Sequence, residues 1–289
     1  MNAQDRNTQI IQAINEWNNW LTPEAREEKY AKMAASPFVF YRGTNHLFWM
    51  DFAGDERLAR FGDEHTHTWL QGDLHAENFG AFTNDEGRVA YSVNDFDESI
   101  FAHYQYDVWR MAISLGIGMD GVIEQSDQVK VITRFARAYL ETLQRFCKND
   151  KNARDFYDSL FVNDAQRAVI AYKAMTQNTD DYLGWMRLPD GSYLVRERTF
   201  VKEAFPLKEL TDAKDFKKMA KQWGKILATV HAHADRLPGI SHMESFEQRV
   251  TELVKKRQQA FEGLVCEVAL GYAETVKGDW EGFVGEFAR

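Results

Sequence analysis

Residues 71–98 read QGDLHAENFGAFTNDEGRVAYSVNDFDE, and this stretch decides the fold of the region around it. Two apolar runs, 79–82 and 89–93, flank the turn-forming sequence NDEG at 84–87, where the glycine can adopt a positive φ. The pattern predicts an antiparallel hairpin. Because a hairpin brings its two open ends together, the residues just outside the two runs are expected to lie side by side.

Three polar residues fall at this open end. Asn78 enters the first strand, Asp95 leaves the second, and Asp73 lies in the loop just before them. Oxygen ligands of this hard type suit Mg²⁺, and a base followed by two such ligands is the set that phosphoryl transfer uses. Asp, Asn and Gly are also common turn formers, so any one of these residues alone indicates only a turn or a cap. The joint pattern G-D-x-H-x-x-N, hairpin, D-F-D-E is more specific.

The segment 72–78 (GDLHAEN) resembles the catalytic loop of aminoglycoside phosphotransferases and choline kinases, relatives of the protein kinases. In the same group, 95–97 (DFD) resembles the metal-binding segment and 106–108 (YDV) the start of the following helix. A closer resemblance, from about residue 37 to near the C-terminus, is to the domain-of-unknown-function 2252 family of bacterial proteins in the kinase-like group. Its further blocks are FYRG at 40–43, NDFDE at 94–98, LGW at 183–185, YLVR at 193–196, HAH at 231–233 and YAE at 272–274.

This resemblance implies a kinase-like fold, α+β and mostly helical, that uses Mg²⁺ and ATP to phosphorylate a hydroxyl of a small molecule or protein. Asp73 would accept the proton of the acceptor hydroxyl or orient it. Asn78 and Asp95 would hold Mg²⁺ between phosphates, and Asp97 would assist. Lys202 would neutralise phosphate charge.

Three more residues in these blocks are candidates for binding the cofactor. Arg42 and Arg196 offer a planar fork that suits phosphate or carboxylate. Either could instead hold Asp97 or Glu98 in a buried ion pair, an interpretation slightly favoured for Arg42. His75 either supports the loop backbone or touches substrate.

The chain departs from the kinase-like pattern in two places. Gln71 stands where the loop usually has a histidine, two places before the aspartate. Residues 147–182 contain no glycine, although the wider family carries a Gly-rich strand-turn-strand and a lysine segment in this region. The tetrapeptide VKEA at 201–204 follows the YLVR block instead of preceding it. The nucleotide lobe is therefore expected to be reduced or rearranged, and an inactive pseudokinase-type binding module or a metal-dependent phosphohydrolase are the alternatives.

Composition narrows the class of protein. The 289 residues are 44% hydrophobic and 13% aromatic, which is enough for a packed core. A net charge of -9 argues against general nucleic-acid binding, and the two cysteines, Cys147 and Cys266, do not suggest a disulfide framework. The polar start of the chain lacks a signal-peptide pattern, and no stretch is apolar enough to cross a membrane. We expect a cytoplasmic protein with no membrane partner, and the sequence indicates no oligomeric state.

The patterning predicts one kinase-like domain, with N-terminal helices in 1–36, the site core in 37–120 and a helical region in 121–289. Extended segments are expected at 38–41 and 68–70, and a second hairpin at 186–200. The expected helices are 8–21, one beginning at Pro23 after a Thr22 cap, 45–52, 107–119 capped by Asp107, 125–146, 152–175, 212–235, and 245–275 followed by an aromatic tail.

Other polar patterns favour ordinary structural roles. His65 and His67 would share one side of an extended segment, but their acidic neighbours favour a solvated loop. His231 and His233 point to different sides of a helix, so they cannot share a metal. A solvated helix face explains the basic stripe of Lys214, Lys218, Lys221 and Lys225.

Overall fold

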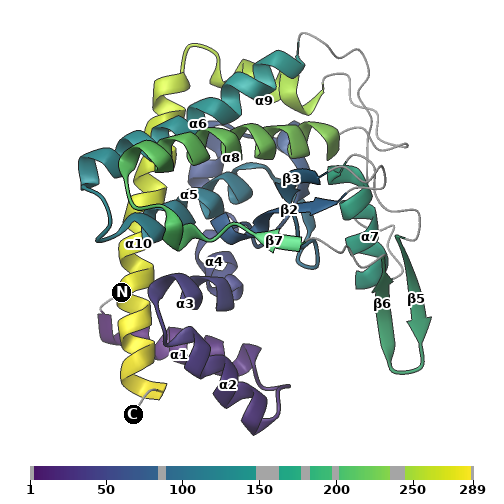
Figure 1. Ribbon diagram of the computed structural model, residues 1–289, viewed down its shortest axis with the longest axis vertical. Helices are drawn as coiled ribbons and strands as arrows, with labels where there is room; N and C mark the ends of the chain where they lie inside the picture. Colours follow the sequence, from purple (N-terminus) through teal and green to yellow (C-terminus); the bar gives the residue numbers. More distant parts are fainter. Residues whose placement is uncertain are drawn as a thin grey trace.

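The computed structural model describes residues 3–83, 89–147, 163–176, 183–196, 202–234 and 245–287. The protein is α+β and mostly helical, as predicted (Figure 1). The helices are α1 (Ala3–Trp17), α2 (Pro23–Met33), α3 (Pro37–Gly43), α4 (Asn45–Phe52), α5 (Gln105–Met119), α6 (Gln125–Phe146), α7 (Asp164–Met175), α8 (Ala213–Ala234), α9 (Phe246–Val254) and α10 (Gln258–Phe287). The strands are β1 (His67–Leu70), β2 (Phe79–Thr83), β3 (Val89–Val93), β4 (Ile100–His103), β5 (Gly184–Leu188), β6 (Gly191–Val195) and β7 (Lys202–Ala204).

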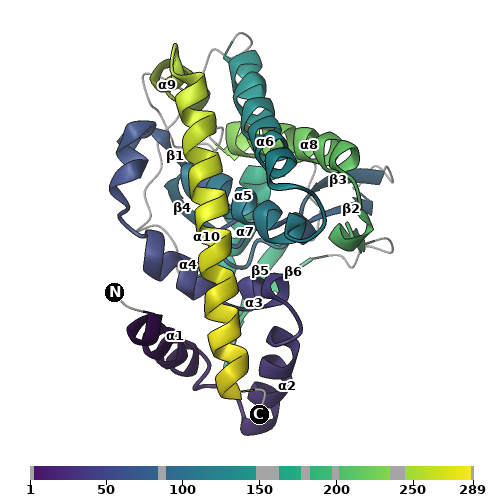
Figure 2. The same cartoon turned by 90° about the vertical axis from the view of Figure 1, so that its left-hand side faces the viewer.

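Helix α10 spans the length of the molecule and packs against α5, α6, α3 and α1 (Figure 2). Its 30 residues correspond to about 45 Å at 1.5 Å per residue. The predicted end of this helix near residue 275, followed by a non-helical aromatic tail, is wrong. The helix continues because its apolar side continues: Phe283 is fully buried and its ring lies 5.5 Å from that of Tyr30.

The N-terminal helices follow capping signals in the sequence. Thr22 accepts a hydrogen bond from the Ala25 N–H at the start of α2, as expected. The predicted extended segment at 38–41 is wrong, because these residues lie in α3. Ser36 caps this helix by accepting from the Val39 N–H, and Pro37 occupies its first position. The Ser-Pro pair was the start signal that outweighed the β-propensity of the FVFY run.

Short strands lie within and on either side of residues 71–98. β2 and β3 form the predicted antiparallel hairpin, with Phe79 opposite Val93 at its open end. The turn itself, 84–88, lies outside the described residues. β7 adds to the other edge of β2 and sets Lys202 opposite Phe82. β1 pairs with β4, so the loop 71–78 leaves one two-stranded sheet and enters the three-stranded one.

Helices α5, α6 and α8 form the packed centre of the helical region. α6 and α8 have the most extensive contact of any pair, and Gly224 permits it. A Cβ at Gly224 would lie 2.4 Å from the Phe135 carbonyl oxygen, so only glycine allows this approach. The predicted helices at 125–146 and 212–235 are confirmed to within one residue at their described ends.

The second predicted hairpin is also present, as β5 and β6, and it projects from the body beside α7 (Figure 1). Its contacts with other elements run mainly to α7. Four large apolar side chains on it are exposed: Trp185, Met186, Leu188 and Tyr193. Of the predicted helix at 152–175, the structure describes the part from Asp164 onward, and that part is helical.

Candidate functional site

The carboxylate of Asp107 binds the backbone at the start of the loop 71–78. The two carboxylate oxygens of Asp107 accept hydrogen bonds from the backbone N–H groups of Gln71 at 2.8 Å and Gly72 at 3.1 Å. The predicted capping role of Asp107 is therefore wrong: Tyr104 is the N-cap of α5, and Asp107 lies inside its first turn. Buried backbone N–H groups need hydrogen-bond acceptors, and the Asp107 carboxylate is the acceptor for two of these groups.

Asp107 belongs to a wider buried network. His231 places Nε2 3.3 Å from the Asp107 carboxylate and Nδ1 2.9 Å from the Tyr139 hydroxyl. Thr68 of β1 donates to the His231 carbonyl at 3.1 Å. The network joins α8, α6, α5 and β1 beneath the loop, so His231 has the packed, hydrogen-bonded role expected of it.

Gly72 allows the loop to turn tightly over the segment after β3. Its φ is +88°, and a Cβ at this position would lie 2.0 Å from the Glu98 carbonyl oxygen. Any L side chain would both be strained and overlap backbone. The loop residues 72–73 and the segment 95–98 are therefore fixed against each other.

Asp73 forms an ion pair with Arg110, a residue of α5 that is fully buried. Arg110 donates to Asp73 Oδ1 through Nε at 2.9 Å and also through Nη2. The guanidinium carbon lies 4.3 Å from the centre of the Tyr41 ring, and Nη2 also donates to the Tyr41 carbonyl. One oxygen of Asp73 is thereby fixed, and these contacts leave Oδ2 as the oxygen that can receive a proton.

The charge state of Asp73 reflects its surroundings. Burial raises the pKa of the Asp73 carboxyl to about 6, Arg110 opposes the rise, and the nearby carboxylates of Glu98 and Asp95 add to it. A carboxyl in this range exchanges protons close to neutral pH, as a general base requires. Asp73, Asp95 and Glu98 are therefore near enough to influence one another electrostatically, and these three are called the carboxylate cluster below.

Asn78 joins the loop to the open end of the hairpin, as predicted. Its Nδ2 donates to the Asp73 carbonyl at 3.1 Å, and its own carbonyl accepts from the Asn94 N–H at 2.8 Å. Gln71 Nε2 donates to the Asp95 carbonyl at 2.5 Å, and Asp95 has a positive φ of 68°. The segments that carry Asp73, Asn78 and Asp95 are therefore adjacent, and the convergence of their side chains on one ion stays a prediction.

Of these residues, Asn78 and Asp95 are the ones that could bind a magnesium ion through side-chain oxygens. Nδ2 of Asn78 donates a hydrogen bond to the Asp73 carbonyl, so Oδ1 would be the atom that binds the ion. The exposed carboxylate of Asp95 would be the second protein ligand. Within the described residues, no group of three or more histidine, cysteine, aspartate or glutamate side chains is arranged to hold a metal. Mg²⁺ commonly binds through one or two protein oxygens, with water and substrate phosphates completing its shell, and this set matches that mode.

Asp97 stands apart from its neighbours. Its described contact is made by its backbone carbonyl, which accepts from Arg167 Nη2 at 3.4 Å, and its side chain is exposed. Asp95 and Glu98, not Asp97, are the residues of this segment that raise the pKa of Asp73. The assisting metal role of Asp97 stays a prediction.

Arg42 does not pair with Asp97 or Glu98, so that prediction is wrong. Arg42 Nη1 donates to Glu77 Oε2 at 2.5 Å, and its side chain is 41% exposed. The reason is the helix α3, which turns Phe40 and Tyr41 inward and leaves Arg42 on the outer side. Because Glu77 precedes Asn78, Arg42 still contacts the loop.

The other predicted cofactor contacts lie in different surroundings. His75 is 2% exposed and packs against Phe38; burial, with Arg42 and Arg110 nearby, lowers its pKa well below the usual range. Arg196 is exposed and stacks over Tyr172, which itself packs against Phe96. Their roles with a ligand stay predictions.

The lysine of the VKEA segment lies in β7. Pairing with Phe82 places the Lys202 backbone four residues along β2 from Asn78, roughly 13 Å at 3.3 Å per residue. The Lys202 side chain is outside what the structure describes, and the proposed contact with phosphate stays a prediction.

Arg110 is the main functional residue that the sequence argument missed. A signal for it was present: Asp107 and Arg110 are the two charged residues in the apolar run 106–119, and their i, i+3 spacing puts them on one side of α5. Charged residues inside a buried helix require partners, and here both partners are in the loop 71–73.

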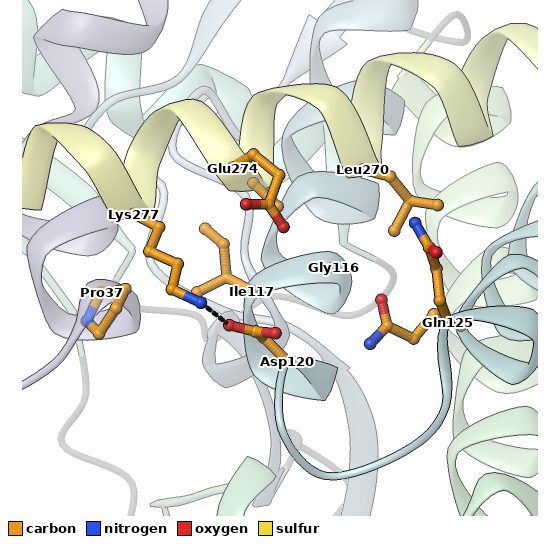
Figure 3. A pocket seen from close by; sticks show the side chains of 10 residues that line it. Pro37, Gly116, Ile117, Asp120, Gln125, Leu270, Glu274 and Lys277 are labelled. Atoms are coloured by element: carbon orange, nitrogen blue, oxygen red, sulfur yellow. Dashed lines mark hydrogen bonds and ion pairs between the residues drawn. The ribbon is translucent and has the colours of Figure 1, made fainter.

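Two of the cavities that lie away from this site adjoin α6. The first, of about 260 Å³, is bounded by α5, α6 and α10, and Lys277 and Asp120, two of its lining residues, form an ion pair (Figure 3). The second is a groove between α6 and α8, where Lys214, Lys218 and Lys221 meet arginines of α6. Lys218 pairs with Asp215 at 2.8 Å, in keeping with a solvated basic face. Neither cavity is lined by a predicted site residue.

Comparison with known families supplies the context for this geometry. A family model described as "Uncharacterized protein conserved in bacteria (DUF2252)" matches residues 21–160 and 151–286. The chain belongs to the DUF2252 family. Comparisons with curated proteins and with solved structures gave no match. The sequence resemblance to this family is thus confirmed. No described helix of this DUF2252 protein has the length and apolar character needed to cross a membrane.

Proposed function

We propose that this DUF2252 protein is a Mg²⁺-dependent phosphotransferase that moves the γ-phosphate of ATP to a hydroxyl group. The observation that carries the proposal is Asp73: a buried carboxylate with one oxygen held by Arg110, coupled to Asp95 and Glu98, and joined to Asn78. A positioned base beside oxygen ligands for a cation is the arrangement that phosphoryl transfer uses.

A kinase-like core is part of the proposal. Three features support it: the loop between β1 and a hairpin, the D-F-D-E segment at the hairpin's open end, and Asp107 of the next helix holding the loop amides. The sequence resemblance to aminoglycoside phosphotransferases adds to them. In this scheme the β7 strand and the β5–β6 hairpin take the place of a reduced nucleotide lobe.

The chemistry of the step follows from these positions. The acceptor oxygen attacks the γ-phosphorus, its proton passes to Asp73 Oδ2, and ADP leaves with the electrons of the broken P–O bond. Arg110 keeps the carboxylate oriented throughout. Magnesium, when bound, neutralises charge on the phosphate oxygens. Asn78 Oδ1 and the Asp95 carboxylate would hold it, because they are the protein oxygens presented at the hairpin end.

The second candidate is a binding module that keeps the nucleotide or metal but performs no transfer. The position of Lys202 favours this binding module, because the Lys202 backbone is paired four residues along β2 from Asn78. The Arg110 ion pair also favours it, because Arg110 stabilises ionised Asp73 and so lowers its basicity. Binding and turnover must therefore be measured separately.

The deciding experiment compares Asp73→Asn with Asp95→Asn. Titration calorimetry measures Mg-ATP binding, and a coupled assay follows ADP release with and without candidate hydroxyl acceptors. Loss of Asp73 should preserve binding and lower turnover by about a hundred- to ten-thousand-fold, the usual general-base contribution. Loss of Asp95 should weaken Mg-ATP binding, because a metal ligand is removed.

Asp190→Asn is the matched control, since Asp190 is an exposed residue of the β5–β6 turn that accepts a hydrogen bond from the Tyr193 hydroxyl. It should behave as wild type in both assays. Equal loss of binding in the two site variants would refute the separate roles. Wild-type binding with no turnover would establish the binding module instead.

A further inference from the structure

Helix α4 connects the N-terminal helices to the loop that carries Asp73. Asn45 Nδ2 donates to the Gly72 carbonyl at 3.2 Å, one residue before Asp73. The next residue, His46, stacks on Trp17 of α1 with ring centres 4.9 Å apart and an angle of 11°. Asn45 and His46 therefore lie between the loop and an indole ring that is 53% exposed.

Several polar atoms in this place are buried without a hydrogen bond in the described part of the chain. They are Asn45 Oδ1, both ring nitrogens of His46, and Arg110 Nη1. Each unpaired buried group of this kind costs about 1–3 kcal/mol, so such atoms are uncommon in native proteins unless water or a ligand pairs them. Their concentration beside Asp73 points to a ligand.

Charged groups define the surroundings of these atoms. Lys29 of α2 is half-buried, donates to Asn18 Oδ1 at 2.7 Å, and is attracted by Glu98 of the carboxylate cluster. Burial, with the positive charges of Lys29 and Arg110, lowers the pKa of His46 to about 4. At neutral pH the imidazole is therefore uncharged, with one nitrogen that donates and one that accepts.

We infer that Asn45, His46, Arg110 Nη1 and Lys29 form the acceptor subsite, which binds the hydroxyl groups of a neutral polyhydroxylated molecule such as a sugar or cyclitol. The acceptor role rests on the proposed function. The buried atoms without a hydrogen bond include both donors and acceptors, and a hydroxyl group can bond to either kind. A carboxylate or phosphate would leave Asn45 Oδ1 unpaired, and an ammonium group, which only donates, would leave Arg110 Nη1 without an acceptor. The exposed part of Trp17 offers an apolar surface to the ring.

The subsite also explains how an acceptor would meet the base. Arg110 contacts Asp73 through Nε and Nη2, while Nη1 is the atom left for the ligand. Nη1 lies on the side of the guanidinium opposite the edge that holds Asp73, so it would bind one hydroxyl of the polyol and leave another for the base. Lys29 is attracted by Glu98 of the carboxylate cluster, so the subsite is coupled to that cluster.

The test uses saturation-transfer NMR on the full chain without nucleotide. The probes are myo-inositol and D-glucose, with cyclohexanecarboxylate and cyclohexylamine as ring compounds that carry a charge and no hydroxyls. His46→Phe keeps a flat ring against Trp17 and removes both nitrogens. His65→Phe is the matched control, because His65 is an exposed histidine outside this place. Circular dichroism and thermal unfolding confirm that both variants are folded.

We expect at least one polyol to bind wild type and His65→Phe equally, and His46→Phe about tenfold more weakly, as the loss of one or two hydrogen bonds predicts. Absence of binding by both polyols, equal binding by His46→Phe, or preference for the charged rings would overturn the subsite. Polyol binding in a protein that never turns over ATP would leave the subsite standing and refute only phosphotransfer. Turnover on other hydroxyl compounds without polyol binding would do the reverse.

Discussion

In the part of the chain that the structure describes, Arg110 and Arg196 lie over tyrosine rings in two very different regions. Arg110 lies 4.3 Å from the ring centre of Tyr41 beneath the loop 71–78, and no part of it is exposed. Arg196 is exposed and lies 6.0 Å from that of Tyr172, at the open end of the β5–β6 hairpin next to α7. The contact is of the same kind, yet Arg110 also carries an ion pair and a backbone bond. The difference teaches that burial, not the ring contact, decides what each arginine does.

The comparison extends to the segments around the two arginines. The loop 71–78 is held by side chains that are distant in sequence, since Asp107, Arg110 and Asn45 all bond it. The hairpin is held mainly by its own ladder and by α7. We expect mutations in the loop to cost far more stability than mutations in the hairpin.

The largest effect is expected from Arg110→Met. This change leaves the Asp73 carboxylate buried without its partner, and breaking a buried pair typically costs about 3–5 kcal/mol. Urea unfolding at pH 7.5 measures the loss. Arg42→Met is the control, because its pair with Glu77 is partly exposed and should contribute at most about 1 kcal/mol. Similar losses in the two variants would contradict the role given to burial.

Gly72→Ala should follow. The positive φ costs about 1–2 kcal/mol, and the new methyl group would overlap the Glu98 carbonyl, which adds roughly 1–3 kcal/mol. Gly54→Ala isolates the first cost, since Gly54 also has a positive φ but has nothing within 4 Å of an added Cβ. If both variants lose the same stability, the tight contact between the loop and residues 95–98 is not present in solution.

A pH-dependent effect is expected at Asp73. Folding raises the pKa of its carboxyl from 3.8 to about 6, so folding favours the protonated form. Its contribution to stability is therefore fully present below about pH 4 and is lost as the pH rises through 6. Wild type should lose stability relative to Asp73→Asn between pH 4.5 and 7.5 in urea unfolding. A relative gain over this range would mean that Arg110 outweighs burial.

The smallest effect is expected from Arg196→Met. An exposed arginine over a ring contributes about 0.5–1 kcal/mol, and the methionine recovers part of the packing. We expect a change within about 0.5 kcal/mol in the free energy of unfolding. A loss near that of Arg110→Met would show that the hairpin is joined to the body as tightly as the loop.

Local patterns predicted most of the fold. The hairpin of β2 and β3, the Thr22 cap and the helix at 45–52 follow from turn chemistry and periodicity, which act within a few residues. The segment 38–41 was mispredicted because its β-propensity was weighed without the Ser36 cap. Local signals compete, and the capping contact prevailed.

The candidate site could be predicted only in part. The adjacency of the segments that carry Asp73, Asn78 and Asp95 follows from one hairpin, so the sequence reveals it. The partner of Asp73 lies 37 residues away and the partner of Arg42 lies 35 away, and such pairings depend on how helices pack. Neither Arg110 nor Asn45 belongs to a local motif that points to the loop.

One contact has a consequence for how the protein is made. Arg6 of α1 bonds Asp51 and also Asp279 of α10, which is 273 residues away. Ribosomes add about 5–20 residues per second, so α1 would wait roughly 15 to 55 s for this partner during synthesis. Its apolar side, with Ile10 and Ile14 buried in the finished protein, stays without α10 for that time. Helix α1 is thus synthesised long before the helix that encloses it.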